Sequence, residues 1–503
     1  MRVLFVTSEA YPLAKSGGLA DVSGALPAAL IGQGIDVRLL LPGYPAALRG
    51  LKDARVEMQL KPLLGIEDAT LISGQLPNSI VPVWLVNAPS LFSRPGDLYQ
   101  DEDGRDWLDN AQRFAFLAHV AARIASGLVR WRPDVIHAND WHAGLLPLLL
   151  SLEPAPAPAT VFTIHNLAYQ GNFPREVLSA LGIPDRFFHA DGLEFYGQVS
   201  FLKAAIRYGD KLTTVSPTYA KEILTPEFGC GLDGVLRDRE HDLFGILNGI
   251  DENIWNPAID NHLPSPYSAK DTAGKRLCKA ELQRECGLEA DPETPLIGFV
   301  SRLAHQKMAD VLLDVVPAIV ESDAQFVLVG KGDPGLETAF ERLNETYPRN
   351  IAIRIGYEEA LAHRIQAGAD MLLAPARFEP CGLTHLYALR YGTLPVVRRT
   401  GGLTDTVTDA NAETLSDRTA NGFVFDDPTA HGLLGAIRRA LTAYREPLTW
   451  RRLQLEGMAR DFSWKKGAAR YASLYSDVTG IPLLPTTPSS ETIGEESARQ
   501  VAM

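Results

Sequence analysis

Two basic residues follow one apolar segment of the chain at a spacing suited to binding a diphosphate. The apolar run 296–300 is followed by the stretch Ser-Arg-Leu-Ala-His-Gln-Lys, which contains Arg302 and Lys307. Arginine presents a planar fork that matches two phosphate oxygens, and lysine adds a compact, mobile charge. Together they could neutralise a pyrophosphate without a metal ion. Two basic residues in a loop are equally compatible with an ordinary solvated surface.

A second loop combines a carboxylate with the start of a helical stretch. Glu379 precedes the segment Pro-Cys-Gly-Leu-Thr at 380–384. Backbone amides at a helix start bind anions, so those of Gly382, Leu383 and Thr384 are expected to face a phosphate. Glu379 would then lie beside the sugar end of such a ligand, or it would merely complement the helix dipole.

A glycine-rich segment follows the first apolar run of the chain. It reads Lys15-Ser16-Gly17-Gly18-Leu19-Ala20-Asp21 and leads into a helical stretch. Adjacent glycines let backbone N–H groups approach an anion, but glycine pairs also form plain strand-to-helix turns. Residue 14 is alanine where a Walker A loop requires glycine, and the segment itself does not contain GxGxxG. The segment is therefore neither of these two nucleotide-binding motifs.

Three possible metal ligands lie close together in the segment His-Ala-Asn-Asp-Trp-His. His137, Asp140 and His142 are of residue types that bind zinc and other transition metals. On residue type and spacing alone, a metal site at this segment stays open as an alternative.

Short runs rich in Val, Ile, Leu and Phe alternate with longer helical stretches along the whole chain. We expect strands near residues 3–8, 37–41, 81–86, 135–138, 160–165 and 211–216 in the first half, and near 243–247, 296–300, 325–330, 351–355, 371–374, 394–397 and 422–425 in the second. Runs that are apolar throughout are typical of parallel strands buried on both faces. Two such series predict two doubly wound α/β sheets, with the site at the carboxyl ends of the strands.

A turn-prone Asn-Gly pair predicts the boundary between the two sheets. Asn248-Gly249 precedes a polar, proline-containing stretch that runs to about residue 271. We expect a first domain over 1–248 and a second over 249–459.

The C-terminal part predicts one further helix and a tail. Ser463 can cap a helix within 460–480, where Trp464 and Tyr475 share one face that should pack onto a domain. Residues 481–503 are rich in Pro, Ser, Thr and Glu, a composition typical of disorder.

The composition excludes several classes of protein. The 503 residues carry a net charge of −13, which argues against binding nucleic acid because that binding depends on neutralising phosphates. The longest nearly apolar run, 143–152, is about half the roughly 20 residues that a membrane-spanning helix needs. Four cysteines without CxxC spacing indicate neither a disulfide framework nor a zinc site. We expect a protein of the reducing cytoplasm, and the sequence does not fix its oligomeric state.

Taken together, the motifs of the chain resemble those of bacterial glycogen synthases and plant starch synthases. The matching segments occur in family order across residues 1–478: Lys15 to Leu19, Leu41 to Tyr44, His137 to His142, Thr163 to Asn166, Asn248 to Asp251, Ser301 to Leu303 with Gln306-Lys307, Gly356-Tyr357, Glu379 to Leu383 and Arg399 to Leu403. No single motif is decisive, but the ordered set is highly specific.

The resemblance implies a fold and an activity. The fold would be GT-B, in which two Rossmann-like domains face a central cleft and the C-terminal helix crosses back to the first domain. The activity would be transfer of glucose from ADP-glucose to the non-reducing end of an α-1,4-glucan such as glycogen, with retention of configuration. ADP-glucose is then a substrate, and neither a cofactor nor a metal ion is expected.

The resemblance also implies roles for individual residues, motif by motif. The residues implied on the donor side are Lys15, Gly17, Gly18, Asp21, Asn248, Tyr357, Cys381, Gly382, Leu383 and Thr384. Arg302 and Lys307 match the pair that stabilises the leaving diphosphate, where negative charge develops. Tyr357 matches the position expected to stack on adenine.

Glu379 and His165 match the residues that contact the donor sugar. Glu379 would orient hydroxyls or stabilise positive charge near the anomeric carbon, and we do not assign it as a covalent nucleophile. The residues implied on the acceptor side are Asp140, Trp141, His142, Arg94 and Tyr99. This placement competes with the metal site considered above, and Trp141 could stack on a glucan ring.

The chain departs from the family pattern at one position that matters. Met308 stands where related enzymes have glycine after the Gln-Lys pair, and methionine does not adopt positive φ easily. If that glycine serves a special backbone shape, the direction of Lys307 changes. A second difference, Tyr387 in place of an acidic residue, is shared with the bacterial synthases and supports the assignment to that branch.

Other functions share part of this pattern. A glycosyltransferase with UDP-glucose as donor, or with a different acceptor, would use the same phosphate chemistry and is the alternative. A nicotinamide dehydrogenase is disfavoured, because the glycine-rich segment after the first apolar run lacks GxGxxG. A glucan-binding module without activity would not need Glu379 and the basic residues, which are all present.

Overall fold

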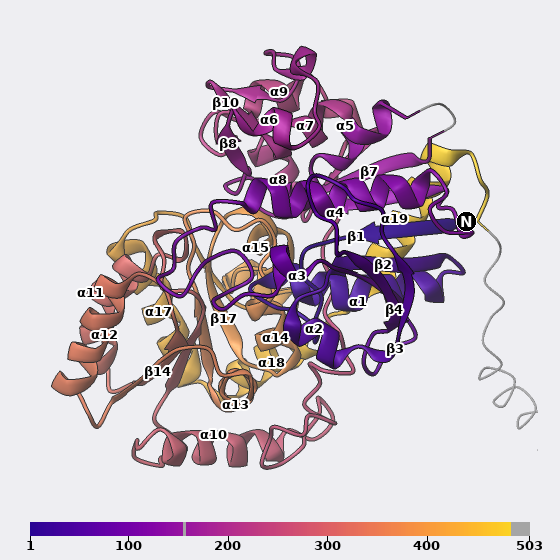
Figure 1. Cartoon of the computed structure of the whole chain (residues 1–503). Helices are drawn as coiled ribbons and strands as arrows, with labels where there is room; N and C mark the ends of the chain where they lie inside the picture. Colours follow the sequence, from indigo (N-terminus) through magenta and orange to yellow (C-terminus); the bar gives the residue numbers. More distant parts are fainter. Residues whose placement is uncertain (154–156, 484–503) are drawn as a thin grey trace, which may run out of the picture.

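The computed structural model describes residues 1–153 and 157–483, and in these ranges the chain forms two main sheets packed with helices (Figure 1). The first sheet has nine strands and the second has six in the described ranges. A small antiparallel sheet is attached to the first domain and consists of β8 (Asn172–Pro174), β10 (Gln198–Ser200) and β9 (Glu194–Phe195). The predicted doubly wound α/β class is confirmed.

The first sheet reverses its strand order at its centre. In spatial order its strands are β12 (Leu243–Gly245), β11 (Lys211–Thr214), β7 (Ala159–Ile164), β6 (Val135–Asn139), β1 (Arg2–Val6), β2 (Asp36–Pro42), β5 (Pro82–Asn87), β4 (Thr70–Gln75) and β3 (Lys52–Gln59). All pairs from β12 to β5 are parallel, and the pairs that involve β4 are antiparallel. The chain proceeds outward from β1 to β2 and β5, and later from β6 in the opposite direction. Ligands of open α/β sheets bind outside the carboxyl ends of the strands at such a reversal.

The second sheet has the same kind of reversal and is parallel throughout. In spatial order its strands are β15 (Ile351–Ile355), β14 (Gln325–Gly330), β13 (Leu296–Val300), β16 (Met371–Ala374), β17 (Leu394–Arg398) and β18 (Phe423–Phe425). The order reverses between β13 and β16. The loops that carry Arg302 and Glu379 therefore both leave from this point.

Helices connect the strands in both domains. In the first domain they are α1 (Gly18–Gly32), α2 (Pro45–Gly50), α3 (Pro89–Phe92), α4 (Asn110–Ala125), α5 (Leu146–Ser151), α6 (Val177–Ala180), α7 (Phe201–Tyr208), α8 (Pro217–Glu222) and α9 (Asp233–Arg237), with short 3₁₀ turns at Trp141–Ala143, Asp185–Phe187 and Glu240–Asp242. In the second they are α10 (Ala273–Glu285), α11 (Ala309–Val320), α12 (Pro334–Thr346), α13 (Glu359–Gly368), α14 (Thr384–Arg390), α15 (Gly401–Thr406), α16 (Ala412–Ser416), α17 (Ala430–Tyr444) and α18 (Pro447–Met458), with a 3₁₀ turn at His305–Lys307.

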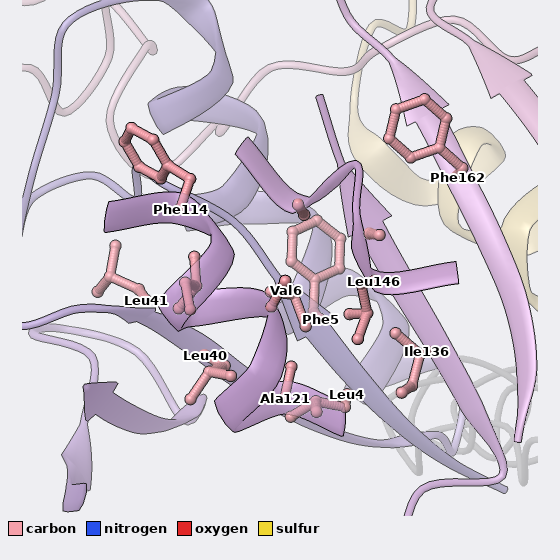
Figure 2. Packing of buried hydrophobic residues seen from close by; sticks show 14 of the residues in the cluster. Leu4, Phe5, Val6, Leu40, Leu41, Phe114, Ala121, Ile136, Leu146 and Phe162 are labelled. Carbon is pink, nitrogen blue, oxygen red and sulfur yellow. The ribbon is translucent and has the colours of Figure 1, made fainter. Parts of the chain in front are cut away.

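The central strand β1 is buried along almost its whole length. Its residues Val3 to Val6 have no exposed surface, as expected of a parallel strand covered on both faces. Figure 2 shows Leu4, Phe5 and Val6 among apolar side chains from β2, β6 and α4. Burial of this strand fixes the loop that follows it, which begins the first domain's half of the site.

The two connections between the domains lie side by side. The Ile250 amide donates to the Phe462 carbonyl at 2.8 Å, and Ile250 forms a parallel bridge with Ser463. A Cβ on Gly249 would lie 2.6 Å from the Trp464 backbone nitrogen, so only glycine allows this approach. The expected boundary at residue 248 falls at the first of these crossings.

The last helix, α19 (Trp464–Thr479), packs on the first domain although it follows the second in sequence. Ser463 caps it, and its buried face includes Trp464, Tyr471 and Tyr475, which join the core of the first sheet. The Tyr475 hydroxyl lies 2.7 Å from Nδ1 of His137 on β6. In Figure 1 the yellow helix lies beside the indigo strand β1 and helix α1, and α1 contacts α19 closely.

The structure differs from the sequence expectation at one edge strand and in two places where strands were not expected. The strand near 243–247 was counted with the second series, but β12 pairs in parallel with β11 at the edge of the first sheet. The hairpin β3–β4 and the small antiparallel sheet were missed, because β3 is polar and almost entirely exposed and the small strands have only two or three residues. The predicted tail begins at 481, and its part from 484 onward lies outside the described residues.

Over the described parts of the chain, no helix combines the length and the apolar character that crossing a membrane requires.

Candidate active site

The three proposed catalytic residues of the second domain follow its two central strands. Arg302 follows β13, Lys307 ends the 3₁₀ turn after it, and Glu379 follows β16. The Lys307 ammonium forms an ion pair with the Glu379 carboxylate, and both side chains are largely buried. Arg302 donates from Nη1 to the Tyr169 hydroxyl of the first domain at 2.7 Å. The structure therefore brings the carboxylate and one cation into contact and directs the other cation across the domain interface.

Met308 adopts a left-handed backbone shape of the kind that favours glycine. Its φ is 52° and its ψ is 32°, in the left-handed region, and its side chain is fully buried in the core of the second domain. Lys307 nevertheless reaches Glu379. The positive φ strains the backbone of the methionine, and burial of its side chain opposes this strain in free energy. The direction of Lys307 toward Glu379 is kept.

The loop before α14 has the shape expected of an anion-binding helix start. Gly382 has a φ of 76°, and Leu383 is the N-cap residue of α14, which begins at Thr384. A Cβ on Gly382 would lie 2.9 Å from the His385 ring. Burial raises the pKa of Cys381 to about 12, so this thiol is protonated at neutral pH and fills space as a small apolar group.

Lys15 of the first domain reaches the second domain. Its ammonium lies 3.0 Å from the Asp21 carboxylate on α1 and 3.5 Å from the Glu359 carboxylate at the start of α13. It also lies 5.5 Å from the centre of the Tyr357 ring. Burial alone would lower the pKa of Lys15, but the two carboxylates and Tyr357 raise it above its usual value. A cation thus lies at the domain interface beside Tyr357, which is 64% exposed.

The amide of Gly17 is hydrogen-bonded within the first domain. The amides of Ser16 and Gly17 donate to Oε2 of the buried Glu9 at 2.7 and 2.9 Å. The carboxylate of Glu9 therefore accepts from the amides that the sequence suggested for a phosphate. Gly18 begins α1 and lies against the second domain, since a Cβ there would be 3.5 Å from a methyl group of Leu383.

His165 is a neutral histidine with one defined tautomer. Its Nε2 lies 2.9 Å from Oδ1 of Asn139, whose Nδ2 donates to the carbonyls of Val6 and His137. Because Asn139 directs an acceptor at the ring, Nε2 carries the proton and Nδ1 keeps a lone pair. Burial lowers the pKa of His165 to about 3. The ring can accept a hydrogen bond at Nδ1 throughout the neutral range.

Asp140 holds the loop that carries His165. It follows β6 with φ 55° and ψ 178°, a strained shape that is normally reserved for glycine. Its Oδ1 accepts the amides of His165 at 2.7 Å and Asn166 at 3.4 Å. Burial raises the pKa of Asp140 to about 7 despite these two bonds. Its contacts are those of a residue that positions the His165 loop.

Trp141 is a buried residue, so little of its indole is available to stack on a glucan ring. Only 9% of it is exposed, and its indole packs against Phe114, His142 and Gly171. Tyr99 stacks on His142 with ring centres 4.5 Å apart, and its hydroxyl contacts Glu9. These aromatic rings contact one another and form one packed layer in the first domain.

His142 and Arg94 have different surroundings. Both ring nitrogens of His142 are buried and have no hydrogen-bond partner among the described residues. Arg94 pairs with both carboxylate oxygens of Asp109 at 2.8 Å and lies over the Trp107 ring. Its guanidinium is therefore engaged within the first domain.

The remaining donor-side candidate, Asn248, lies where the chain first crosses between the domains. It is 8% exposed, and its Oδ1 is buried without a partner among the residues that the structure describes. Its backbone lies beside the Cys381 thiol. Asn248 thus lies next to the Glu379 loop.

The segment from His137 to His142 does not gather metal ligands. His137 lies inside β6 and bonds through both ring nitrogens, to Tyr475 and to Oγ1 of Thr163 at 2.6 Å. In residues 1–153 and 157–483, no group of three or more His, Cys, Asp or Glu side chains is placed to hold a metal ion.

Sequence reasoning missed several residues at this interface. Glu9 lies three residues after β1, and Glu359 begins α13 close to the Gly356-Tyr357 motif. Their positions beside recognised motifs were the available signal. Tyr169 lies in an exposed loop, and nothing in its surroundings in the sequence distinguishes it. Its role depends on the second domain, which no local pattern can supply.

Two family models match the chain and cover its two domains separately. The model described as starch synthase catalytic domain matches residues 2–238. The model described as glycosyl transferases group 1 matches residues 286–452. Both matches lie within the domains that the two sheets define.

Proteins of similar sequence and structure cover almost the whole chain. A protein named glycogen synthase from Paramagnetospirillum magneticum is 51% identical over 484 residues, which are 95% of this chain and 98% of the relative. One of the same name from Burkholderia thailandensis is 52% identical, with 95% and 90% covered. The catalytic domain of starch synthase IV from Arabidopsis thaliana, solved with ADP and acarbose, has a TM-score of 0.88 at 32% identity, with 95% of this chain and 99% of that chain covered.

A more distant structure shares the fold alone. Sucrose-phosphate synthase from Thermosynechococcus elongatus has a TM-score of 0.60 at 17% identity. The two facing Rossmann-like domains, the matched models and the relatives over 95% of the chain agree. The chain belongs to the glycogen synthase and starch synthase family of GT-B glycosyltransferases.

Proposed function

We propose that this chain transfers glucose from ADP-glucose to the non-reducing end of an α-1,4-glucan and so elongates glycogen with retention of configuration. The observation that carries this proposal is the convergence of Lys307, Glu379 and the start of α14 at the reversal point of the second sheet, with Lys15 opposite. The names of the relatives, and the ADP and acarbose bound by the starch synthase, support this donor and acceptor.

The diphosphate is the group that gains negative charge as the bond to glucose breaks. Arg302 and Lys307 follow β13 and can neutralise that charge, and the amides of Leu383 and Thr384 add the positive end of the α14 dipole. Fixed cations and amides stabilise this charge most when they are already in place. We therefore propose that the reaction needs neither a cofactor nor a metal ion.

The glucose lies between Glu379 and His165 in this proposal. The C1 bond to the diphosphate oxygen breaks, a bond from C1 to the acceptor O4 forms on the same face, and the O4 proton passes to a diphosphate oxygen. Glu379 orients glucose hydroxyls or stabilises the positive charge near C1. His165 accepts a hydrogen bond from a sugar hydroxyl at Nδ1, because its Nε2 already donates to Asn139.

The nucleotide base has a candidate partner in Tyr357. The Tyr357 ring is exposed enough to stack on adenine, and Lys15 lies beside it to meet the phosphates.

The four cysteines are all free. This agrees with the reducing cytoplasm that we propose as the location.

The test measures ADP release by the purified protein with ADP-glucose, with and without maltooligosaccharide, in the presence of EDTA. We expect release only when the acceptor is present, with undiminished rates in EDTA. A Glu379→Ala variant should lose at least about a hundredfold in kcat, as expected when a transition-state contact is removed. A clear preference for UDP-glucose, or an unchanged rate in the variant, would reject the proposal.

A further inference from the structure

Two short helices from opposite domains, α8 and α15, are joined by hydrogen bonds at both of their ends. At the start of α8 in the first domain, the Thr218 amide and hydroxyl donate to the two carboxylate oxygens of Asp405 on α15, at 2.9 and 2.7 Å. At the end of α8, Oε1 of Glu222 accepts the amide of Gly401 at 2.9 Å and the hydroxyl of Thr400 at 3.2 Å, both at the start of α15. We call this reciprocal contact of α8 and α15 the clasp.

The second-domain half of the clasp lies directly against the loop of Glu379. The Gly402 amide donates to the Glu379 carbonyl at 3.1 Å. A Cβ on Gly401 would lie 1.8 Å from that carbonyl oxygen, and a Cβ on Gly402 would lie 2.4 Å from the Cys381 carbonyl. Gly401 also has a φ of 45°. The start of α15 therefore touches the backbone of the Glu379 loop without any intervening side chain.

The first-domain half of the clasp is joined to the loop of His165. The Tyr219 hydroxyl on α8 accepts the amide of Leu167 at 3.1 Å, and Tyr219 is buried. Ser216 caps α8 directly after β11. Helix α8 thus connects the loop that carries His165 to the helix that supports Glu379.

The clasp is not explained by stability alone. The second oxygen of Glu222, Oε2, is buried without a hydrogen-bond partner among the described residues. Burial raises the pKa of Glu222, in spite of the bonds from Gly401 and Thr400. A half-satisfied buried carboxylate costs free energy, so a gain in stability does not account for its position.

We propose that Glu222, Asp405 and Thr218 are positioning residues, through which approach of the first domain sets the Glu379 loop in its reactive position. The clasp bridges the two domains, so it exists only when they are close together. Glu379 would then be correctly placed for catalysis only after closure, which limits loss of the donor to water. This inference rests on the proposed function for its kinetic readout.

The experiment compares Asp405→Ala, Glu222→Ala and Thr218→Val with the wild type. We expect kcat to fall about tenfold in each variant, while the Kd for ADP, measured by calorimetry, changes less than twofold. ADP affinity should persist because Arg302, Lys307 and Tyr357, which supply most of the proposed ADP contacts beside Lys15, belong to the second domain and are not in the clasp. The double variant Asp405→Ala with Glu222→Ala should lose less than the product of the two single losses, because both act on the same closure.

Two matched variants separate positioning from general damage. Thr218→Ser keeps the donating hydroxyl and should retain wild-type kcat, whereas Thr218→Val should not. Glu227→Gln removes an exposed carboxylate soon after α8 that forms no ion pair in the described part of the chain, and it should have no effect. If Thr218→Ser is as impaired as Thr218→Val, or if kcat is unchanged in all three clasp variants, the inference is wrong.

Small-angle X-ray scattering distinguishes failure of the clasp from failure of the proposed function. With ADP and maltooligosaccharide, the wild type should become more compact than Asp405→Ala, whether or not it turns over ADP-glucose. A wild type without turnover but with this difference would overturn the proposed function and keep the clasp. Equal compaction in wild type and variant would overturn the clasp.

Discussion

Replacing Lys307 with methionine separates stability from catalysis at the centre of the site. Lys307 forms an ion pair with Glu379, and the two side chains are only 19% and 12% exposed. Methionine keeps most of the length and the apolar stem of lysine but removes the charge. The variant therefore leaves the Glu379 carboxylate largely buried and without its cation.

The structure gives the expected size of both effects. Removing one partner of a buried ion pair typically costs about 3–5 kcal/mol, because the remaining charge is uncompensated. We expect the lower end, about 3 kcal/mol, since the pair keeps some access to water. The same change removes a cation from the leaving diphosphate, which should lower kcat by about a hundredfold to a thousandfold.

The second substitution Glu379→Gln tells the two effects apart. In the double variant Lys307→Met with Glu379→Gln, no charge is left unpaired, so most of the lost stability should return. Activity should not return, because both proposed catalytic groups are gone. The assays are urea unfolding for stability and ADP release at saturating ADP-glucose for kcat.

Two results would refute this reasoning. Unchanged stability in Lys307→Met would mean that the ion pair is not desolvated in solution. Recovery of kcat in the double variant would mean that the single variant lost activity only through instability, and that neither residue acts on the substrate.

Three further predictions concern the residues around the site. Tyr475→Phe leaves Nδ1 of His137 buried without a partner and should lower the free energy of unfolding by about 1–3 kcal/mol, measured by urea denaturation, while an unchanged midpoint would show that α19 is not anchored there. Burial raises the pKa of Asp140 to about 7, so its contribution to stability is full below about pH 4 and is lost as the pH rises to about 7. Asp140→Asn should therefore remove about 4 kcal/mol of pH dependence between pH 4 and 7, and parallel pH profiles of the two proteins would contradict this. Met308→Gly should relieve about 1 kcal/mol of strain but lose at least about 2 kcal/mol of packing, so the net effect is lower stability with unchanged kcat, and a large change in kcat would show that the side chain directs Lys307.

The fold was largely predictable because its strands are apolar throughout. Strands β1, β6 and β13 lie between layers of helices, and that burial is written into their composition. Strand β3 was not predictable in the same way, since it is polar and exposed and pairs only through its backbone. The edge strand β12 was assigned to the wrong series, because a strand of three residues carries too little pattern to show which sheet it joins.

The candidate site was predictable as a set of loops but not as a set of contacts. Lys307 and Glu379 were recognised separately, and only the reversal between β13 and β16 brings them together. Glu9 was missed because a buried carboxylate and a phosphate satisfy the same backbone amides. Trp141 was considered for stacking on a glucan ring, and its burial against Gly171 was not predictable because that residue lies outside its own motif.

The interface between the domains was the least predictable part. The partners of Lys15 and Arg302 in the opposite domain, Glu359 and Tyr169, depend on how the two sheets face each other. Sequence periodicity reports burial within one domain, so it contains no signal for these pairs.

The most direct test of the central claim follows the fate of the sugar itself. ADP-glucose labelled with ¹³C at C1 would be incubated with the protein and maltoheptaose, and the product examined by NMR. We predict that the label appears in a new α-1,4 linkage at the non-reducing end, with one ADP formed for each linkage. Label found only in free glucose, in a β-linkage, or still in unconsumed ADP-glucose would contradict the account.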